Sequence, residues 1–249
     1  MIKNEDNKKA INNKEKEKKP LINNSKYKIE IIKDNILNDE IMYKIIIIGN
    51  SSVGKTSLTI RLTQNLFEES RPATIGFDIF NYCAKINDII IKLQIWDTCG
   101  LEDFSSCTPS LFKNAALAIV VYSIDDLDSF KNLEKWVNLV RSNGSPDTLI
   151  FIVGNKKDLV KKRKIQKIEG EKFKKERKYN FFIEASAKEN EFVNELFQEA
   201  IIQLYEQYKE LQNNEDKGRL DFTKRKESVK LKNIKQKKEK EEEKTKLCC

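Results

Sequence analysis

The chain has 249 residues, 39 % hydrophobic and 35 % charged, with a formal net charge of +8. Residues 43–209 carry only +2 of that charge, which argues against a basic nucleic-acid groove on the globular part. No apolar run approaches the ~18–20 residues of a membrane span, and the N-terminus lacks the apolar core of a signal peptide. The chain has five cysteines, no C-x-x-C pair and no His, which argues against a zinc site and favours a reduced, cytosol-facing protein.

The N-terminal region has two parts. Residues 1–28 are rich in Lys, Asn and Glu and nearly free of large apolar side chains, so they are predicted to be disordered. Residues 29–42 carry more apolar side chains and predict a short helix or strand. We therefore expect residues 1–41 to be a polar, disordered extension of a domain that spans residues 42–209. The sequence leaves open whether translation begins at Met1 or at Met42.

Strand-like and helix-like segments alternate through the predicted domain. The predicted strands are residues 43–48, 77–86, 89–96, 116–122, 148–154 and 181–185. The predicted helices are residues 55–66, 128–142, 168–178 and 191–209. Asn87-Asp88 between two alternating runs indicates a hairpin, so one strand should be antiparallel. The pattern predicts an α/β fold with a six-stranded, mostly parallel sheet and helices on both faces, and ligands bind such sheets beyond the carboxyl ends of the strands.

The stretch 49–56 joins the first of these strands to the first helix and fits G-x-x-x-x-G-K-[ST]. In this context the pattern predicts a phosphate-binding loop and hence a P-loop NTPase fold, and a polar turn that matches by chance is the disfavoured alternative. Lys55 is predicted to reach the β- and γ-phosphates, and the Thr56 hydroxyl to bind Mg²⁺. Backbone N–H groups and the helix N-terminus would face the phosphates. The other predicted nucleotide contacts of this stretch are Ser51, Ser52, Val53, Gly54 and Ser57.

Three further motifs follow predicted strands. In Asp97-Thr98-Cys99-Gly100, Asp97 is predicted to hold Mg²⁺, usually through water, and the Gly100 N–H to meet a γ-phosphate. Taken alone, this D-x-x-G pattern would more often be an ordinary turn. Asn155-Lys156-Lys157-Asp158 follows an apolar run. The Asp158 carboxylate can accept both the ring N–H and the exocyclic amino group of guanine, whereas adenine lacks this donor pair.

The last motif, Glu184-Ala185-Ser186-Ala187-Lys188, follows the final predicted strand, where the Ala187 N–H could meet the guanine carbonyl. We include Asn155, Lys156, Ser186 and Lys188 with it in the predicted base site. Each motif has a solvated turn as its alternative, but all four in this order favour a guanine-nucleotide site over a P-loop kinase or ATPase.

On these motifs, residues 42–209 resemble the Ras superfamily of small GTPases and, within it, the Rab family. The resemblance implies a GTP/GDP switch with Mg²⁺ that regulates vesicle traffic. In Thr74-Ile75-Gly76-Phe77-Asp78, similar to the first switch of Rabs, it implies that Thr74 is a second ligand of Mg²⁺ and the γ-phosphate. It also implies that Phe67 stacks on guanine, with a core phenylalanine as the alternative.

The resemblance implies the partners and the location as well. The implied partners are an exchange factor, a GTPase-activating protein, effectors, a GDP-dissociation inhibitor and a prenylation escort. The protein itself is expected to be a monomer that binds no nucleic acid. Cys248-Cys249 matches the double-cysteine end that Rabs carry for geranylgeranylation, so residues 210–249 are predicted to be a charged, flexible tail with a lipid anchor. The expected location is the cytoplasmic face of an intracellular membrane, with cycling through the cytosol.

Leu101 departs from the family, which usually places a glutamine after the D-x-x-G glycine to orient the attacking water. Leucine can neither donate nor accept a hydrogen bond, so intrinsic GTP hydrolysis is predicted to be slow. Lys55, Thr74, Gly100 and Leu101 make up the predicted catalytic set. The alternative function is a nearly non-hydrolysing GTP-binding platform that recruits effectors to membranes.

Overall fold

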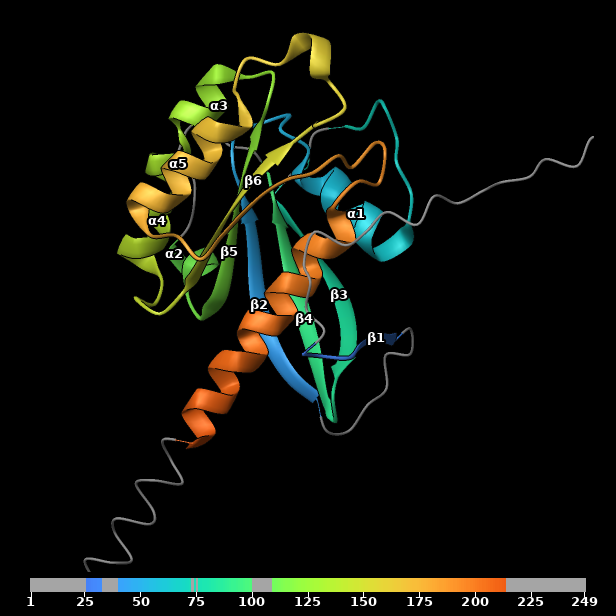
Figure 1. Ribbon diagram of the computed structural model, residues 1–249, viewed down its shortest axis with the longest axis vertical. Coiled ribbons are helices and arrows are strands. Elements are labelled where there is room, and N and C mark those ends of the chain that lie inside the picture. Colours follow the sequence, from blue (N-terminus) through green and yellow to red (C-terminus); the bar gives the residue numbers. More distant parts are fainter. Residues whose placement is uncertain (1–25, 33–39, 73, 75, 100–108, 214–249) are drawn as a thin grey trace, which may run out of the picture.

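The computed structural model describes residues 26–32, 40–72, 74, 76–99 and 109–213, which form one sheet flanked by helices (Figure 1). The strands are β1 (Ile29–Ile32), β2 (Glu40–Ile48), β3 (Phe77–Ile86), β4 (Ile89–Thr98), β5 (Ala115–Ser123), β6 (Leu149–Asn155) and β7 (Phe181–Glu184). The helices are α1 (Lys55–Gln64), α2 (Pro109–Phe112), α3 (Leu127–Lys131), α4 (Leu133–Asn143) and α5 (Lys167–Arg177), with a 3₁₀ helix η2 (Val160–Lys162). A last helix spans residues 193–213 and is called the C-terminal helix below.

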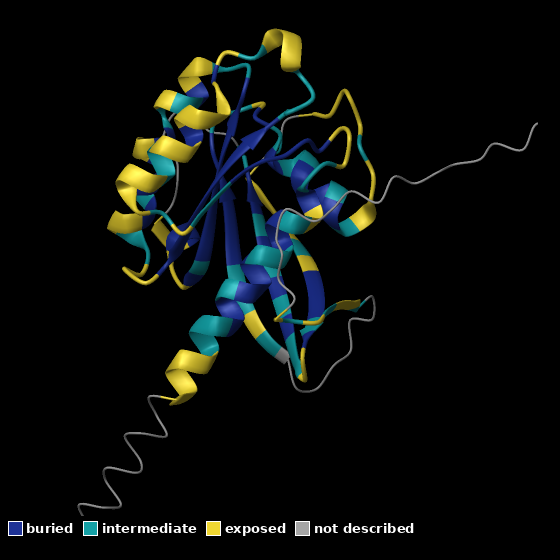
Figure 2. Ribbon diagram, viewed as in Figure 1, coloured by how far each residue is buried: buried dark blue, intermediate teal, exposed yellow. Residues whose placement is uncertain are grey.

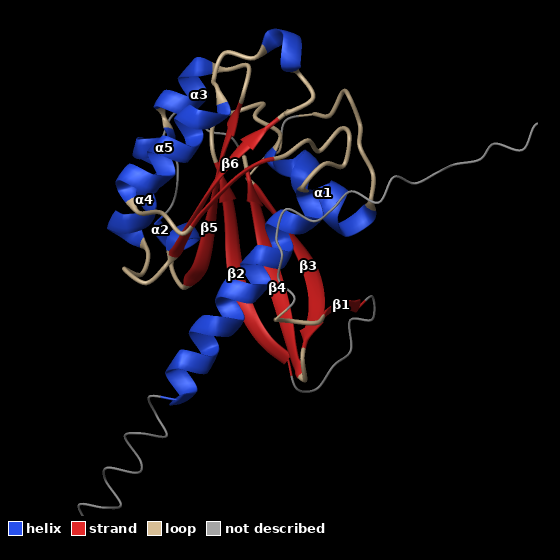
Figure 3. Cartoon of the chain, in the orientation of Figure 1, coloured by secondary structure: helices blue, strands red, loops and turns tan. Residues whose placement is uncertain are grey.

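The sheet has the strand order β1-β3-β4-β2-β5-β6-β7, drawn in red in Figure 3. Strands β4, β2, β5, β6 and β7 pair in parallel, and β3 pairs antiparallel with both of its neighbours. The predicted α/β fold and the hairpin at Asn87-Asp88 are confirmed, because Ile86 pairs directly with Ile89 and Asn87 takes a positive φ of 53°. The six predicted strands are all present, and β1 adds a seventh.

Alternation along β2 explains why its sequence is a continuous apolar run. Ile45 and Ile47 lie in the core on the face covered by α1 and the C-terminal helix, whereas Ile46 and Ile48 lie in the core beneath α2 to α5. Figure 1 shows α3, α4 and α5 together on one side of the sheet. Figure 2 shows the central strands buried and the outer faces of these helices exposed. A strand that is buried on both faces carries apolar side chains at successive positions, so its sequence does not alternate between apolar and polar residues.

The single helix predicted over residues 128–142 is wrong, because the chain forms two helices that meet at Asn132. Asp126 starts α3 by accepting hydrogen bonds from the backbone N–H groups of Asp128 and Ser129. The Asn132 side chain then donates to Asn50 Oδ1 at 3.4 Å. Apolar residues of helical spacing continue across the break, so the local pattern hides it. The short helix α2 was also not predicted.

The short helix or strand predicted within residues 29–42 is confirmed as the strand β1, so the expected disorder of residues 1–41 is wrong for Ile29–Ile32. The edge of β3 offers unpaired backbone groups, and Ile29–Ile32 pair with Cys83–Ile86 along it. Tyr27 then packs edge-on against Tyr205 of the C-terminal helix, with ring centroids 5.4 Å apart. Its hydroxyl donates to Glu206 Oε1 at 3.0 Å. Residues 1–25 and 33–39 lie outside the described residues.

Removal of residues 1–32 is expected to lower stability, whereas removal of residues 1–25 should have little effect. The longer deletion exposes the edge of β3 and removes the Tyr27 contacts, which we expect to cost about 2 kcal/mol of unfolding free energy. This corresponds to a fall of about 4–8 °C in Tm for a domain of this size. GDP affinity should be unchanged, because β1 pairs with the end of β3 that lies farthest from Thr74. Thermal unfolding of both truncated proteins tests this, and equal Tm values would contradict it.

Candidate functional site

A pocket of about 790 Å³ lies where the loops that follow β2, β6 and β7 meet. This is the carboxyl edge of the parallel strands, the usual ligand site of such a sheet. The predicted site residues that line it are Ser51, Ser52, Gly54, Lys55, Thr56, Ser57, Phe67, Thr74, Asn155, Lys156, Asp158, Ala187 and Lys188. Of the other predicted residues, Val53, Asp97 and Ser186 are buried, and Gly100, Leu101, Cys248 and Cys249 lie outside the described residues. The tertiary fold thus brings segments from four motifs together.

The phosphate loop, residues 49–56, wraps around the ammonium group of Lys55. Lys55 Nζ donates to the carbonyl oxygens of Gly49 at 2.9 Å and Asn50 at 2.8 Å. Asn50 is itself held by Trp136 of α4, whose indole Nε1 donates to Asn50 Oδ1 at 2.9 Å. The lysine is 5 % exposed, so its charge is placed at the floor of the pocket. A buried ammonium beside a loop of backbone N–H groups suits polyphosphate oxygens.

Two glycines of this loop are required by close contacts. Gly54 has a φ of 91°, and a Cβ there would come within 2.3 Å of Asn155 Nδ2. Gly49 has a φ of 144°, and its Cβ would lie 2.2 Å from the carbonyl oxygen of Val121. Asn155 Nδ2 donates to the Val53 carbonyl at 2.9 Å. One side chain of the predicted base motif therefore holds the phosphate loop in place.

Thr56, Thr74 and Asp97 meet beside the phosphate loop. Thr56 Oγ1 donates to Asp97 Oδ2 at 2.6 Å and lies 2.9 Å from Thr74 Oγ1. Asp97 is fully buried, and its Oδ1 has no hydrogen-bond partner among the described residues. Burial raises the pKa of Asp97 to about 6, partly offset by the Thr56 hydrogen bond and the nearby charge of Lys55. An unpartnered buried carboxylate oxygen next to two hydroxyls fits a bound cation.

The donor set fits Mg²⁺ rather than a metal held by protein alone. Within the described part of the chain, no three His, Cys, Asp or Glu side chains form a cluster that could hold a metal. Mg²⁺ is commonly bound by one or two carboxylates together with phosphate oxygens and water. One carboxylate and two hydroxyls at the edge of a phosphate loop match this chemistry.

A Mg²⁺ ion at this site would need the ionised form of Asp97, so its affinity is expected to fall at acidic pH. Below about pH 6, Mg²⁺ must displace a proton, and its apparent affinity should fall about tenfold per pH unit. The stability of the metal-free protein is expected to change with pH in the opposite direction to the Mg²⁺ affinity. Its folded state holds the Asp97 proton more tightly than the unfolded chain does, so the free energy of unfolding falls as pH rises from about 4 to about 6. Mg²⁺ titrations of bound fluorescent GDP from pH 5 to pH 8 measure the effect. Asp97→Asn should abolish the dependence, and equal affinities at pH 5 and pH 7 would contradict it.

The loop after β7, residues 185–188 and hereafter the base loop, packs against Asn155 and Asp158. Ser186 Oγ donates to Asp158 Oδ1 at 2.6 Å. The backbone N–H of Ala187 donates weakly to Asn155 Oδ1 at 3.3 Å. Ser186 orients the Asp158 carboxylate, and Asp158 and Ala187 both line the pocket, the first with a hydrogen-bond acceptor and the second with a backbone donor. This is the pattern that the edge of guanine complements.

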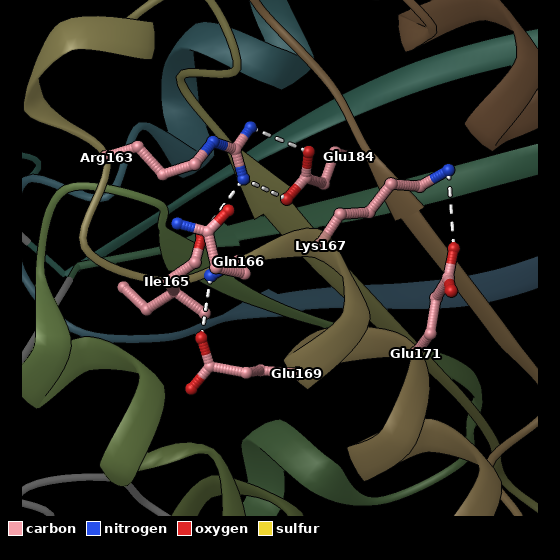
Figure 4. A network of polar contacts seen from close by, with 7 residues as sticks. All are labelled: Arg163, Ile165, Gln166, Lys167, Glu169, Glu171 and Glu184. Atoms are coloured by element: carbon pink, nitrogen blue, oxygen red, sulfur yellow. Dashed lines mark hydrogen bonds and ion pairs between the residues drawn. The ribbon is translucent and has the colours of Figure 1, made fainter.

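An ion pair holds the start of the base loop (Figure 4). Arg163 donates to both carboxylate oxygens of Glu184, at 2.6 and 2.9 Å, and also to the Ile165 carbonyl at 2.9 Å. The Glu184 side chain is 3 % exposed, so this bidentate pair is largely desolvated. In the same view, Gln166 and Glu169 cap the first turn of α5. The segment that follows β6 is therefore fixed to the last residue of β7, outside the pocket.

Sequence reasoning missed part of the pocket wall. The lining residues that it did not single out as site residues are Glu68, Glu69, Ser70, Arg71, Pro72, Thr98, Cys99 and Leu159. Five of these lie between Phe67 and Thr74, which were both predicted to contact the ligand. The sequence feature that could have predicted these five residues is their position, because a segment between two predicted ligand contacts is expected to run along the ligand.

Comparisons with known proteins agree with the motifs. The sequence profile described as Ras family matches residues 44–206. The chain is also 43 % identical over 154 residues to the Ras-related protein Rab-11B of Dictyostelium discoideum, an alignment that covers 62 % of this chain and 70 % of the relative. The matched region contains every described residue that lines the pocket.

Proposed function

The chain belongs to the Ras family as a Rab-like small GTPase, and on this premise we propose that its pocket binds GTP and GDP together with Mg²⁺. Such a protein hydrolyses GTP to GDP and acts as a switch in vesicle trafficking. The proposal assigns the phosphates to the loop at residues 49–56 and the base to Asp158 and the base loop. The residues that carry it come from motifs that are far apart in the sequence and adjacent in the fold.

On the phosphate side, Lys55 and the backbone N–H groups of its loop would bind the β- and γ-phosphate oxygens. Thr56, Thr74 and Asp97 would hold Mg²⁺, which neutralises the charge that develops on the phosphates during transfer. Thr74 comes from the segment that leads into β3, so bound GTP would hold this segment and its loss would release it. The buried Asp97 carboxylate with its unpartnered oxygen supports this assignment.

The observation that carries the guanine assignment is the Asp158–Ser186 contact at 2.6 Å. The Ser186 hydroxyl occupies one lone pair of Asp158 and orients the rest of the carboxylate. A buried or half-buried carboxylate left without donors is costly, so a base that lacks two adjacent donors is rejected. Competition of GDP and ATP against fluorescent GDP tests the proposal, with guanine expected to bind at least about a thousandfold tighter. Equal competition by ATP would overturn it.

Exposed apolar side chains next to Thr74 support a partner surface for effectors and regulators. Phe77 is 51 % and Ile79 is 44 % exposed at the start of β3. Phe77 stacks on Trp96 of β4, with ring centroids 4.8 Å apart. Large apolar side chains that stay exposed in this way mark interaction sites. A partner that docks here would sense whether Thr74 is engaged by the nucleotide.

We assign membrane attachment to prenyl groups on Cys248 and Cys249, at the cytoplasmic face of an intracellular membrane. In the part of the chain that the structure describes, no helix combines the length and apolarity that crossing a membrane requires. Replacement of both cysteines by Ser is expected to move the protein to the soluble fraction. Two lipid chains attach a protein stably to a membrane, and the double variant would carry neither chain. Either single replacement should leave weak, reversible attachment. Cell fractionation measures this, and a double variant that still pellets would place the attachment elsewhere.

Leu101 favours a second function, a GTP-binding platform that hydrolyses its nucleotide very slowly. The side chain offers no hydrogen bond to the attacking water. Such a protein would remain in its GTP state and recruit effectors until an activating protein supplies the missing group in trans. The unaided rate of hydrolysis separates this function from that of an ordinary switch.

A further inference from the structure

Arg61, on the last turn of α1, connects the base loop to the segment that follows α1. Its Nε donates to the Ala187 carbonyl at 2.8 Å, and its Nη2 donates to the Lys188 carbonyl at 3.1 Å. Its Nη1 donates to the backbone carbonyl of Asn65 at 2.9 Å. The guanidinium also lies 6.0 Å from the ring centroid of Phe67, at the limit of a cation–π contact. No motif that predicted the site includes Arg61, and it does not line the pocket.

These contacts act on the backbone that would recognise the base. The Ala187 and Lys188 carbonyls belong to the peptide groups that directly follow the Ala187 N–H. Each peptide group is planar, so holding these two carbonyls fixes the two peptide groups after Ala187. The Ala187 N–H lies in the peptide group before them and can then turn only about the two backbone bonds of Ala187. A planar guanidinium presents its donors in a fixed fork and so sets the directions of the carbonyls that it binds, whereas an ammonium group on a flexible stem does not fix these directions.

A second contact between the same segments is weaker. Lys188 Nζ pairs with Glu69 at 2.6 Å, but these side chains are 46 % and 73 % exposed. Exposed ion pairs of this kind typically contribute about 0–1 kcal/mol. Arg61 is partly buried and donates to backbone carbonyls, so it is the stronger of the two connections.

From this geometry we infer that Arg61 is a positioning residue for guanine recognition. It holds the Ala187 N–H toward the 6-oxo group of the guanine base, and it thereby limits the rate of nucleotide release. The inference rests on the proposed guanine-nucleotide function. It also links the base loop to the segment that runs from Asn65 toward Thr74. A partner that moves this segment would therefore loosen the base as well as the metal.

The test compares Arg61→Ala with Arg141→Ala in the full-length chain. Arg141 is a matched control, because it lies near the end of α4 and donates to the carbonyls of Pro146 and Thr148, at 2.9 and 2.8 Å, without lining the pocket. Release of fluorescent GDP should be about tenfold faster in Arg61→Ala, or 1.4 kcal/mol, and unchanged in Arg141→Ala. Arg61→Lys should resemble Arg61→Ala, because it keeps the charge but loses the fork.

Base analogues separate positioning from general loosening. In 6-thio-GDP only the 6-oxygen is replaced, so the preference for GDP over this analogue should fall to about one in Arg61→Ala. Inosine diphosphate lacks the 2-amino group, which would donate a hydrogen bond to Asp158. The preference for GDP over inosine diphosphate should therefore stay at the wild-type value in Arg61→Ala. If Arg61→Ala behaves as Arg141→Ala does, or weakens all three nucleotides equally, the inference is overturned. If the wild type itself does not prefer GDP to ADP, the proposed function fails instead.

Discussion

Asp158→Asn is expected to lower the preference for GDP over ADP by at least about a hundredfold, while the protein stays folded. The carboxylate would accept two donors from guanine, and hydrogen bonds to a charged acceptor contribute about 1.5–3 kcal/mol each. An amide can accept only one of them and turns its own N–H group toward the other. The Ser186 hydroxyl can still donate to the amide oxygen, so the local fold keeps its 2.6 Å contact in altered form.

The measurement is competitive displacement of fluorescent GDP by GDP and ADP, with thermal unfolding alongside. Asp88→Asn is the matched control, because Asp88 is an exposed aspartate in the β3–β4 turn and does not line the pocket. It should leave both affinities at the wild-type values. A variant at Asp158 that keeps the full guanine preference would remove this residue from the base site.

Leu101→Gln is expected to speed unaided GTP hydrolysis about 10–100-fold. Phosphoryl transfer depends on positioning and charge stabilisation, so an amide that orients the attacking water acts on the chemical step itself. Unaided hydrolysis in Ras-type proteins is only about 10⁻⁴ s⁻¹ even with that amide. Its absence should cost about 1.4–2.8 kcal/mol of transition-state stabilisation. GTP affinity should not change, since the residues proposed to bind phosphate and Mg²⁺ remain.

Single-turnover hydrolysis of bound GTP measures this rate. Leu101→Met is the matched control, since methionine has a similar volume and no amide, and it should hydrolyse GTP at the wild-type rate. If wild type and Leu101→Gln show the same unaided rate, slow hydrolysis does not come from this position. A very slow wild type that Leu101→Gln accelerates would support the platform function.

Residue patterns along the chain predict the six main strands and the loops that carry the motifs. The phosphate loop was recognisable because its glycines, Lys55 and Thr56 act within eight consecutive residues between a strand and a helix. The Asn87-Asp88 hairpin was recognisable for the same reason, since a two-residue turn depends on local backbone conformation. The unbroken apolar run of β2 matches its burial on both faces of the sheet.

The contacts between these segments depend on the tertiary fold. Asn155 bonds to the phosphate loop across 102 positions of the chain, and Arg61 bonds to the base loop across 126. The pairing of β1 with β3 and the break at Asn132 likewise depend on partners distant in the sequence. Hydrogen bonds of this kind leave no periodic pattern, because any donor that the fold brings within about 3 Å of an acceptor can make them. Local periodicity reports which face of an element is buried, and the packing of whole elements selects the side chains that meet.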